Sequence, residues 1–481
     1  MSESSCFDPS RRRWLQRGSL TLTAALGTAA GASWLWPARS AFAADYRALV
    51  CVFLYGGNDG NNTIVPVDNI RHAQYRRARG VLALPQASLM ALDASGYGLH
   101  PSMSALLPHW TAGQLAPVFN VGPLASPINK AQYRAAPDNS PQVPESLFSH
   151  SHQQTLWEAA GRSAMARDGW GGRASEVLRT TNPVISVGSN GLFGVSATQA
   201  PLVVPGPGAE FGVYEFGSEP WRTTHAPAMA RAAALRSFYH GSDSHELTDA
   251  LMRKQRAAFD ITSRLGQTVT DQPAQTAAAI AEAFAPLIVG GKLSTDLASQ
   301  LFQVAKLIAQ RAVVQGDRQI FFAQQGGFDT HGGQVTGDGA LLGHHADLLK
   351  TLADALAAFQ RAMVNLNLAN QVTTFTQSDF GRTLAPNDSL GSDHAWGNHH
   401  LVLGGAVKGR TTYGRLPELE LGGPDDVGQD SWELQGRWIP TVSVEQYGAT
   451  LLRWFGADEG QLDQVFPNLA AFGAQRSLGF V

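Results

Sequence analysis

The chain has 481 residues, a formal net charge of −3 and 16% charged residues. Hydrophobic residues make up 44% of it, which is enough core-forming material for one large or two ordinary domains. No basic run stands out beyond the amino-terminal segment, so the composition argues against nucleic acid as a partner. Cys6 lies in that segment, and Cys51 alone can form neither an intramolecular disulfide nor a thiolate metal cluster.

The amino-terminal segment has the features of an export signal. Arg11, Arg12 and Arg13 fit the twin-arginine (Tat) pattern, and a mildly apolar stretch follows over 20–36. Small residues within 41–43 suit a signal peptidase. The alternative is a membrane anchor, but glycines interrupt the stretch and its hydrophobicity is low for a membrane span.

We therefore predict that residues 1–43 are a cleaved Tat signal peptide, with the Tat translocase as a partner during export. Residues 44–481 are expected to form a single domain with a mainly helical insertion around 201–315. No later apolar run approaches the ~20 residues that cross a bilayer. The sequence thus predicts a periplasmic or secreted protein without a membrane span after cleavage.

Apolar runs, and one run of β-branched and aromatic residues over 372–376, predict the buried strands of an α/β fold, and the first run is typical of a strand covered on both faces. The runs are 48–55, 115–122, 319–323 and 372–378. Asp59 follows the first run in a glycine-rich turn, where a ligand or ion can approach the backbone closely. The alternative reading of Asp59 is an ordinary Asx turn.

Ser149 and Ser151 stand before a helical pattern over 153–161. A serine at a helix N-terminus is often only an N-cap. The functional alternative is a nucleophilic or phosphate-binding hydroxyl at the positive end of the helix. Because the chain contains no G-x-S-x-G segment, an α/β-hydrolase triad is disfavoured.

The middle of the chain is predicted to be helical decoration on the sheet. Apolar periodicity indicates helices over 228–237, 244–265, 276–284 and 297–315. No internal repeat appears.

Asp329 and His331 follow the predicted strand 319–323. Alternate residues of an extended segment share a face, so Asp-x-His suits one ion bound by both side chains. An amphipathic helix over 348–363 then leads to the strand 372–378, completing a parallel strand, helix, strand unit. If the two strands are adjacent, they bring Asp329 and Asp379 to the same sheet edge.

A dense group of ionisable side chains follows the strand 372–378. In open α/β sheets such groups at the carboxyl ends of strands mark the ligand site. The residues are Asp379, Arg382, Asp393, His394, His399 and His400.

Five segments together resemble the signature blocks of the DUF1501 family, which consists of exported, often Tat-dependent bacterial proteins. The segments are 56–60 (GGNDG), 148–150 (FSH), 327–331 (GFDTH), 378–383 (SDFGRT) and 391–397 (GSDHAWG). The block order extends over essentially the whole chain after the signal. That family in turn resembles the alkaline phosphatase and sulfatase superfamily, which implies a central, mostly parallel sheet sandwiched by helices with metal bound at the strand ends.

The superfamily resemblance implies a role for each matching residue. Asp59 matches the acid after the first strand, Ser149 the nucleophile, and Asp329 with His331 the ligands of a first metal. Asp379 and His394 match a further acid and a late histidine.

Two departures from the superfamily pattern bear on the metal site. Phe380 stands where the superfamily pair has histidine, and the spacing of Asp329 to His331 is shorter than the superfamily's. Either Asp393 with His394 rebuilds a second site, or one ion is bound, or none. A formylglycine nucleophile is excluded, because the sequence after Cys51 lacks its maturation motif.

The resulting hypothesis is a hydrolase of phosphate or sulfate esters that uses one or two divalent metal ions, zinc, manganese or calcium. Arg382 would clamp the anionic oxygens of a small anionic ester substrate, and His399 or His400 would orient a ligand or protonate the leaving group. One alternative is a non-catalytic periplasmic binding protein on the same fold. Another is a structural role, in which Asp329, Asp379 and Arg382 form buried ion pairs that fix loops.

The export signal gives a first testable prediction. Changing Arg11 and Arg12 together to Lys should leave the precursor in the cytoplasm, because the Tat receptor reads the arginine pair and Lys lacks its planar fork. Fractionation followed by immunoblotting measures the outcome. Normal periplasmic accumulation of the double variant would instead indicate the general secretory route.

Overall fold

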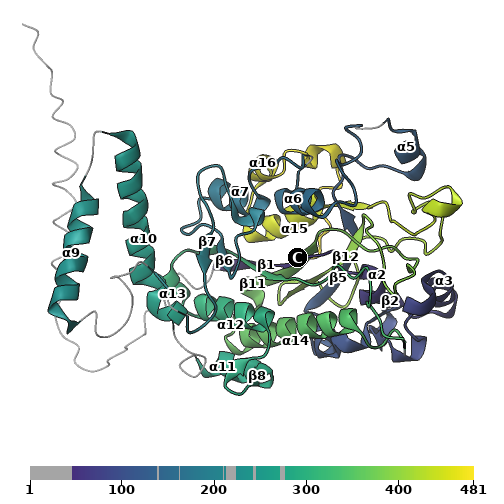
Figure 1. The fold of residues 1–481 in the computed structure, drawn as a ribbon, viewed down its shortest axis with the longest axis horizontal. Helices are drawn as coiled ribbons and strands as arrows, with labels where there is room; N and C mark the ends of the chain where they lie inside the picture. The colour runs from purple at the N-terminus through teal and green to yellow at the C-terminus, as the bar shows by residue number, and fades with distance from the viewer. Residues whose placement is uncertain are drawn as a thin grey trace, which may run out of the picture. The chain divides into compact units, whose positions relative to one another are not determined.

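A large central sheet organises the part of the chain that the computed structural model describes, shown in Figure 1. That part covers residues 46–481 except 138–139, 162, 210, 213–223, 242–244, 271–276 and 338. The predicted signal peptide and its cleavage site lie outside the described residues.

Eight strands form this sheet within the described residues, and all but β12 run in the same direction. The prediction of a mostly parallel central sheet is confirmed. In spatial order the strands are β13 (Val442–Ser443), β5 (Leu115–Gly122), β12 (Asn398–Gly404), β11 (Val372–Ser378), β1 (Arg47–Leu54), β10 (Arg318–Gln325), β6 (Ile185–Val187) and β7 (Leu202–Val204).

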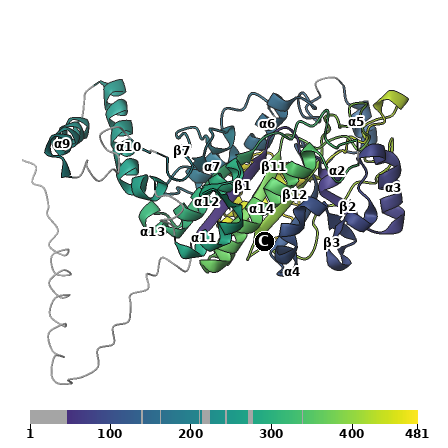
Figure 2. The ribbon, with the colours of Figure 1, turned by 60° about the horizontal axis from the view of Figure 1, so that its bottom comes forward.

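The continuous apolar runs of the central strands reflect helices on both faces of the sheet. Along β1, Val50 and Val52 face one hydrophobic cluster, and Cys51 and Phe53 face the other. The first cluster includes α11 (Ala278–Phe284), α12 (Asp296–Ala309) and α14 (His344–Asn365), which lie in front of the sheet in Figure 2. The second includes α6 (His150–Ala159), α7 (Trp170–Val177), α15 (Val444–Phe455) and α16 (Glu459–Val465), which lie above the sheet in Figure 1.

The four strands expected from apolar runs are confirmed as β1, β5, β10 and β11. The unit β10, α14, β11 is also parallel as expected, but its two strands are not neighbours. β1 lies between them and pairs with both. The sequence pattern predicts that β10 and β11 run in the same direction. It does not predict that another strand lies between them.

The four helices predicted in the middle of the chain are present, with one correction. They are α9 (Ala226–His240), α10 (Glu246–Thr270), α11 and α12, and a short α13 (Arg311–Val314) follows after a break at Gln310. α12 is not decoration, because nearly all its side chains between Leu297 and Ile308 are buried in the first hydrophobic cluster.

The smaller elements lie around these layers. They are α2 (Gly60–Thr63), β2 (Ile64–Pro66), α3 (Asn69–Arg79), β3 (Met90–Ala91), β4 (Tyr97–Leu99), α4 (Leu107–Thr111), α5 (Lys130–Ala135), β8 (Ile288–Val289) and β9 (Lys292–Leu293).

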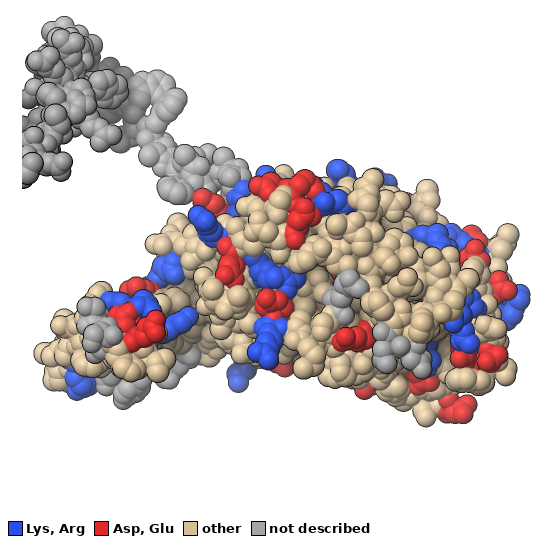
Figure 3. Space-filling view, turned by 90° about the horizontal axis from the view of Figure 1, so that it is seen from above, with Lys and Arg blue, Asp and Glu red and all other residues tan. Residues whose placement is uncertain are grey.

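Two surface properties agree with the composition. Among the described residues, no helix combines the length and the apolar character needed to cross a membrane. The face drawn in Figure 3 carries basic and acidic side chains interspersed, without a continuous basic stripe among its described residues. This face therefore has none of the electrostatic features of a nucleic-acid surface.

The turn after β1 is held by a buried polar network around Asp59. One carboxylate oxygen of Asp59 accepts the Asn61 N–H at 3.1 Å and thereby caps α2. The other forms an ion pair with Arg79, and both side chains are fully buried. It also accepts from the Gln334 amide at 2.5 Å, and that amide's oxygen accepts from Ser392 at 2.5 Å. The turn after β1 is thus tied to two loops distant in sequence.

This network gives a second testable prediction. Arg79→Met should lower the free energy of unfolding by about 3–5 kcal/mol, because the Asp59 charge would stay buried without its partner. Arg77→Met, an exposed position on the same helix, should change stability by about 0.5 kcal/mol or less. Urea denaturation of both variants measures the difference, and equal midpoints would show that the ion pair contributes nothing.

Candidate functional site

Three parallel strands end side by side at the candidate site. β1 pairs with β10 and β11, and its Leu54 is in register with both Gln325 and Ser378. The loops that follow therefore leave the sheet at the same level, where ligands bind in open α/β sheets. Asp379 follows β11 directly, and both its carboxylate oxygens lie 3.2 Å from the Gly56 nitrogen beyond β1.

A fourth segment, the first turn of α6, completes the site. His150 Nδ1 lies 2.7 Å from Asp379 Oδ2, and the Gln154 amide donates to the same oxygen at 2.7 Å. His150 and Gln154 are four residues apart and so share one helix face. The sequence pattern around His150 did not predict a ligand role for it. The only signal was its place in the family-like block 148–150.

In each of three histidines, the Nδ1 atom contacts an oxygen that can accept a hydrogen bond but cannot donate one. His331 Nδ1 lies 3.0 Å from Asp393 Oδ1, and His394 Nδ1 lies 2.6 Å from the carbonyl oxygen of Phe148. His150 makes the corresponding contact with its aspartate. Because carboxylate and carbonyl oxygens accept hydrogen bonds, all three Nδ1 atoms carry the hydrogen. In the neutral rings the Nε2 atoms therefore present lone pairs.

The three Nε2 atoms converge on one carboxylate oxygen, Asp329 Oδ1. Its distances to His150, His331 and His394 are 3.3, 3.2 and 3.5 Å. The His331 and His394 Nε2 atoms are only 2.7 Å apart, and His150 Nε2 is buried without a hydrogen-bond partner. Two lone pairs at that distance repel each other unless a proton or cation lies between them. The donor set of three nitrogens and one oxygen fits a transition-metal cation.

The side chains of this cluster are partly open to solvent, which a ligand site requires. Asp329 is 49% exposed and His331 is 45% exposed. His150, Asp329 and His394 offer ligand atoms that all lie within 4.8 Å of one another.

Arg382 has a different role from the predicted anion clamp. Its side chain is fully buried, and its Nη2 atom lies 2.5 Å from Asp329 Oδ1. The remaining donors are directed at backbone rather than at solvent, so the guanidinium is not free to hold a substrate. The carbonyl acceptors belong to Gly56, Gly57, Phe328 and Ser392.

This arrangement agrees in part with the structural alternative. Arg382 and Asp329 do form an ion pair, but only the guanidinium is buried. Asp379 is buried and bonds to His150 and Gly56 rather than to Arg382.

The electrostatics of the cluster favour charged carboxylates and one basic imidazole. The hydrogen bond with Asp379 raises the pKa of His150. Burial lowers the pKa of His394. Burial by itself would raise the pKa of Asp329, but the hydrogen bond and charge of Arg382 outweigh it, and the pKa lies below its ordinary value. Asp329 is therefore an anion at neutral pH, as a metal ligand must be.

Phe380 does not supply a ligand and instead packs the cluster. Its buried ring lies with its centroid 4.8 Å from that of His150 and 4.5 Å from that of His394. Phe380 thus offers no ligand atom but restricts the planes of two imidazoles.

The two candidate serines differ in their surroundings. Ser149 is the N-cap residue of α6, yet its side chain makes no capping bond. Its hydroxyl instead lies 2.9 Å from Nδ1 of His152. Ser151 is exposed. The simple capping explanation for Ser149 is therefore wrong.

Two predicted site residues lie outside the cluster. Asp59 is occupied by the buried network with Arg79 and Gln334. His399 is buried on β12, where its Nδ1 accepts the Asn120 N–H at 3.1 Å. Burial lowers the pKa of His399 to about 4, so it is neutral at pH 7 and unsuited to protonating a leaving group.

His400 is the other histidine considered for that role. It is buried against Trp157, with the ring centroids 4.8 Å apart. Burial lowers its pKa to about 3, so it too is neutral at pH 7. Neither histidine of the pair contacts the cluster, because β12 directs both into the interior.

Comparison with solved structures gives weak similarities. Two crystal structures of Ps i-CgsB, one in complex with k-i-k-neocarrahexaose, each align with a TM-score of 0.33 and 10% sequence identity. The alignments cover 89% of this chain and 76% or 77% of the other. A TM-score this low carries no argument about function.

No curated protein matches the chain significantly. The family described as "Protein of unknown function (DUF1501)" matches residues 46–426. That match includes every residue of the cluster and the buried network that supports it. The chain therefore belongs to the DUF1501 family.

Proposed function

We propose that this protein binds one divalent metal ion through His150, His331, His394 and Asp329, and that it hydrolyses phosphate or sulfate esters at this centre. The observation that carries the proposal is the convergence of three imidazole Nε2 atoms on Asp329 Oδ1, within 3.5 Å. Nitrogen-rich donor sets favour zinc or manganese over calcium, which prefers oxygen ligands.

The partners of the imidazoles support this assignment. Metal-bound histidines usually donate their second ring N–H to a carboxylate or carbonyl, which fixes the ring and strengthens the ligand. Asp379 and Asp393 occupy these positions for His150 and His331. We therefore assign these two aspartates as supports of the ligands rather than as ligands, which revises the role expected from sequence.

Ester hydrolysis requires polarisation of the ester and a nucleophile. A divalent cation supplies positive charge that polarises a phosphoryl or sulfuryl oxygen and favours ionisation of a nearby hydroxyl. Ser149 is the nucleophile that we propose. Its neighbours Phe148 and His150 both contact the cluster, and the N-terminus of α6 stabilises anionic oxygens.

A specific observation also favours a second candidate, a non-catalytic metal-binding protein. Arg382 is fully buried and committed to carbonyl oxygens and Asp329. It therefore does not offer the cationic clamp that holds the anionic oxygens in many phosphoryl-transfer sites. Both candidate functions include metal binding, but only the first includes hydrolysis of an ester.

Metal binding is the third testable prediction. Protein purified from the periplasm should contain close to one zinc or manganese per chain. Metal-free protein should gain about 2.7 kcal/mol of stability at a metal concentration 100 times the Kd. Asp393→Asn should weaken binding about 10–100-fold, because the support of His331 is altered.

His394→Ala should abolish the stabilisation by metal, whereas His240→Ala, an exposed histidine at the end of α9, should retain it. Elemental analysis and thermal unfolding measure both effects. A wild-type protein that contains no metal and gains no stability from zinc, manganese or calcium would contradict the proposed centre.

The fourth prediction concerns the nucleophile. Ser149→Ala should abolish hydrolysis of aryl phosphates or sulfates while the metal content stays unchanged. Ser151→Ala, the exposed serine two residues away, is the matched control and should keep the wild-type rate. Because Ser149 makes no capping bond, its replacement should not lower the melting temperature through helix capping.

Three outcomes distinguish the candidates. Loss of activity only in Ser149→Ala supports the serine mechanism. An unchanged rate in Ser149→Ala would exclude this nucleophile. A wild-type protein that holds metal but turns over no phosphate monoester, diester or sulfate would favour the binding protein.

A further inference from the structure

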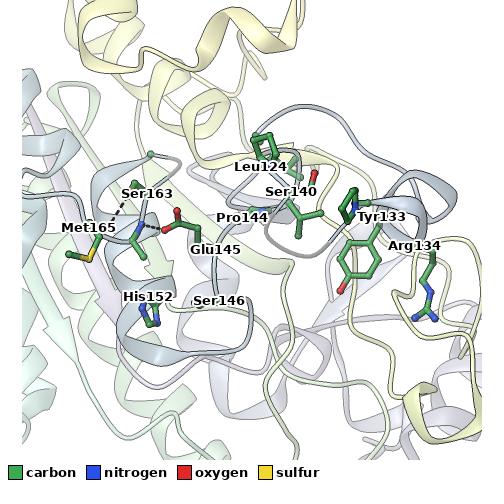
Figure 4. Close-up of a pocket in the computed structure, with 17 residues that line it drawn as sticks. Leu124, Tyr133, Arg134, Ser140, Pro144, Glu145, Ser146, His152, Ser163 and Met165 are labelled. Atoms are coloured by element: carbon green, nitrogen blue, oxygen red, sulfur yellow. Dashed lines mark hydrogen bonds between the residues drawn. The ribbon is translucent and has the colours of Figure 1, made fainter.

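A cavity of about 900 Å3 lies beside the first turn of α6 (Figure 4). Figure 4 shows Glu145, His152 and Met165 on one side of it and Tyr133 and Arg134 on the opposite side. None of the four proposed metal ligands lines this cavity. Its volume is in the range of small-molecule pockets.

The charged groups of the cavity are already engaged. Arg134 pairs with Glu433 at 2.8 Å, and Glu145 accepts the Ala164 N–H at 3.1 Å. Among the described residues that line the cavity, the one arginine is thus already paired with a carboxylate. The rest of the lining mixes hydroxyl-bearing and apolar side chains, which suits an uncharged molecule. Examples are Leu124, Tyr133, Ser140, Ser146, Ser163 and Met165.

His152 joins this cavity to the proposed nucleophile. Its side chain lines the cavity, and its Nδ1 atom lies 2.9 Å from Ser149 Oγ. The carbonyl oxygen of Phe148, the residue before Ser149, accepts a hydrogen bond from His394. His150, the residue after Ser149, is itself one of the proposed metal ligands and contacts Asp379. Ser149 therefore follows and precedes residues that belong to or contact the cluster, and its hydroxyl contacts a residue that lines the cavity.

The backbone before α6 is held in a conformation that non-glycine residues rarely adopt. Ser146 has φ 48° and Phe148 has φ 72°. The Ser146 carbonyl accepts the Ser149 N–H at 3.2 Å, and the Phe148 carbonyl accepts from His394. Such strained residues concentrate at functional sites, where surrounding contacts maintain them. The two strained residues set the position of Ser149 relative to the cluster and the cavity.

We infer that this cavity is the subsite for the alcohol part of the ester, and that this alcohol is bulky and uncharged. In the same arrangement His152 is a positioning residue, which orients the Ser149 hydroxyl at the border of the two sites. This inference rests on the proposed ester hydrolysis at the metal cluster.

The test uses a binding probe and an ester of the same alcohol. The probe is 4-methylumbelliferone, whose binding to the zinc-loaded protein is measured by calorimetry, and its phosphate and sulfate esters report turnover. Ethyl phosphate and ethyl sulfate are the small-alcohol comparison. Ala136→Trp takes up part of the cavity with a bulky side chain, and the matched control Ala94→Trp lies in a separate, smaller pocket.

Ala136→Trp should weaken probe binding about tenfold or more, as expected when a pocket is filled and its contacts are lost. The KM for the 4-methylumbelliferyl ester should rise by a similar factor, and kcat/KM for the ethyl ester should stay unchanged. Ala94→Trp should behave as wild type in all three measurements.

The measurements distinguish failure of the subsite from failure of the proposed ester hydrolysis. Equal probe binding by Ala136→Trp and Ala94→Trp would overturn the subsite, even if esters are hydrolysed. Probe binding that is lost only in Ala136→Trp supports the subsite, even if no ester is turned over and the proposed reaction fails.

Steady-state kinetics test the positioning role of His152 separately. His152→Ala should lower kcat with little change in KM and no loss of stabilisation by zinc, because the hydroxyl loses its orientation. His152→Asn keeps a polar atom near the position of Nδ1 and should restore part of kcat. Equal kcat values for His152→Ala and wild type would overturn the positioning role.

Discussion

One buried guanidinium holds together the loops that form the site. Arg382 donates to carbonyl oxygens beyond β1, beyond β10 and in the loop that carries His394, and it pairs with Asp329. Hydrogen bonds to charged groups contribute about 1.5–3 kcal/mol each, and an unpaired buried carbonyl costs free energy. Burial disfavours the charged form and lowers the pKa of Arg382, and the many acceptors around the guanidinium offset this cost. The cluster therefore depends on Arg382 as a support, although sequence placed it among the substrate-binding groups.

The buried network around Asp59 is a second support of the same kind. It connects the turn after β1 through Gln334 to Ser392, whose carbonyl also accepts from Arg382. The loop that carries Asp393 and His394 is consequently fixed from two directions. Rigid loops at strand ends hold the three Nε2 atoms and Asp329 close together, and such preorganisation is what the proposed metal centre would require.

The three aspartates differ in which imidazole nitrogen they contact. Asp329 faces the three Nε2 atoms, whereas Asp379 and Asp393 face Nδ1 atoms. All three are acids near strand ends, and nothing in their local sequence separates ligand from support. Phe380 contributes by packing against His150 and His394. A phenyl ring at this position offers no ligand atom, which is consistent with the single ion that we propose.

The sequence by itself determined β1, β5, β10 and β11, which are four of the eight strands described in the sheet, and the shared direction of β10 and β11. It also grouped Asp329, His331, Asp379 and His394 in the loops after β10 and β11. These follow from apolar periodicity and from side chains placed directly after strands, which are local properties. Tertiary structure decided the rest. α6 folds over the strand ends and adds His150, and the partners of Asp59 and Arg382 come from distant segments. The position of β12 between β11 and β5, in a sheet covered on both faces, buries His399 and His400. Such pairings depend on strand order and helix docking, which a one-dimensional pattern does not encode.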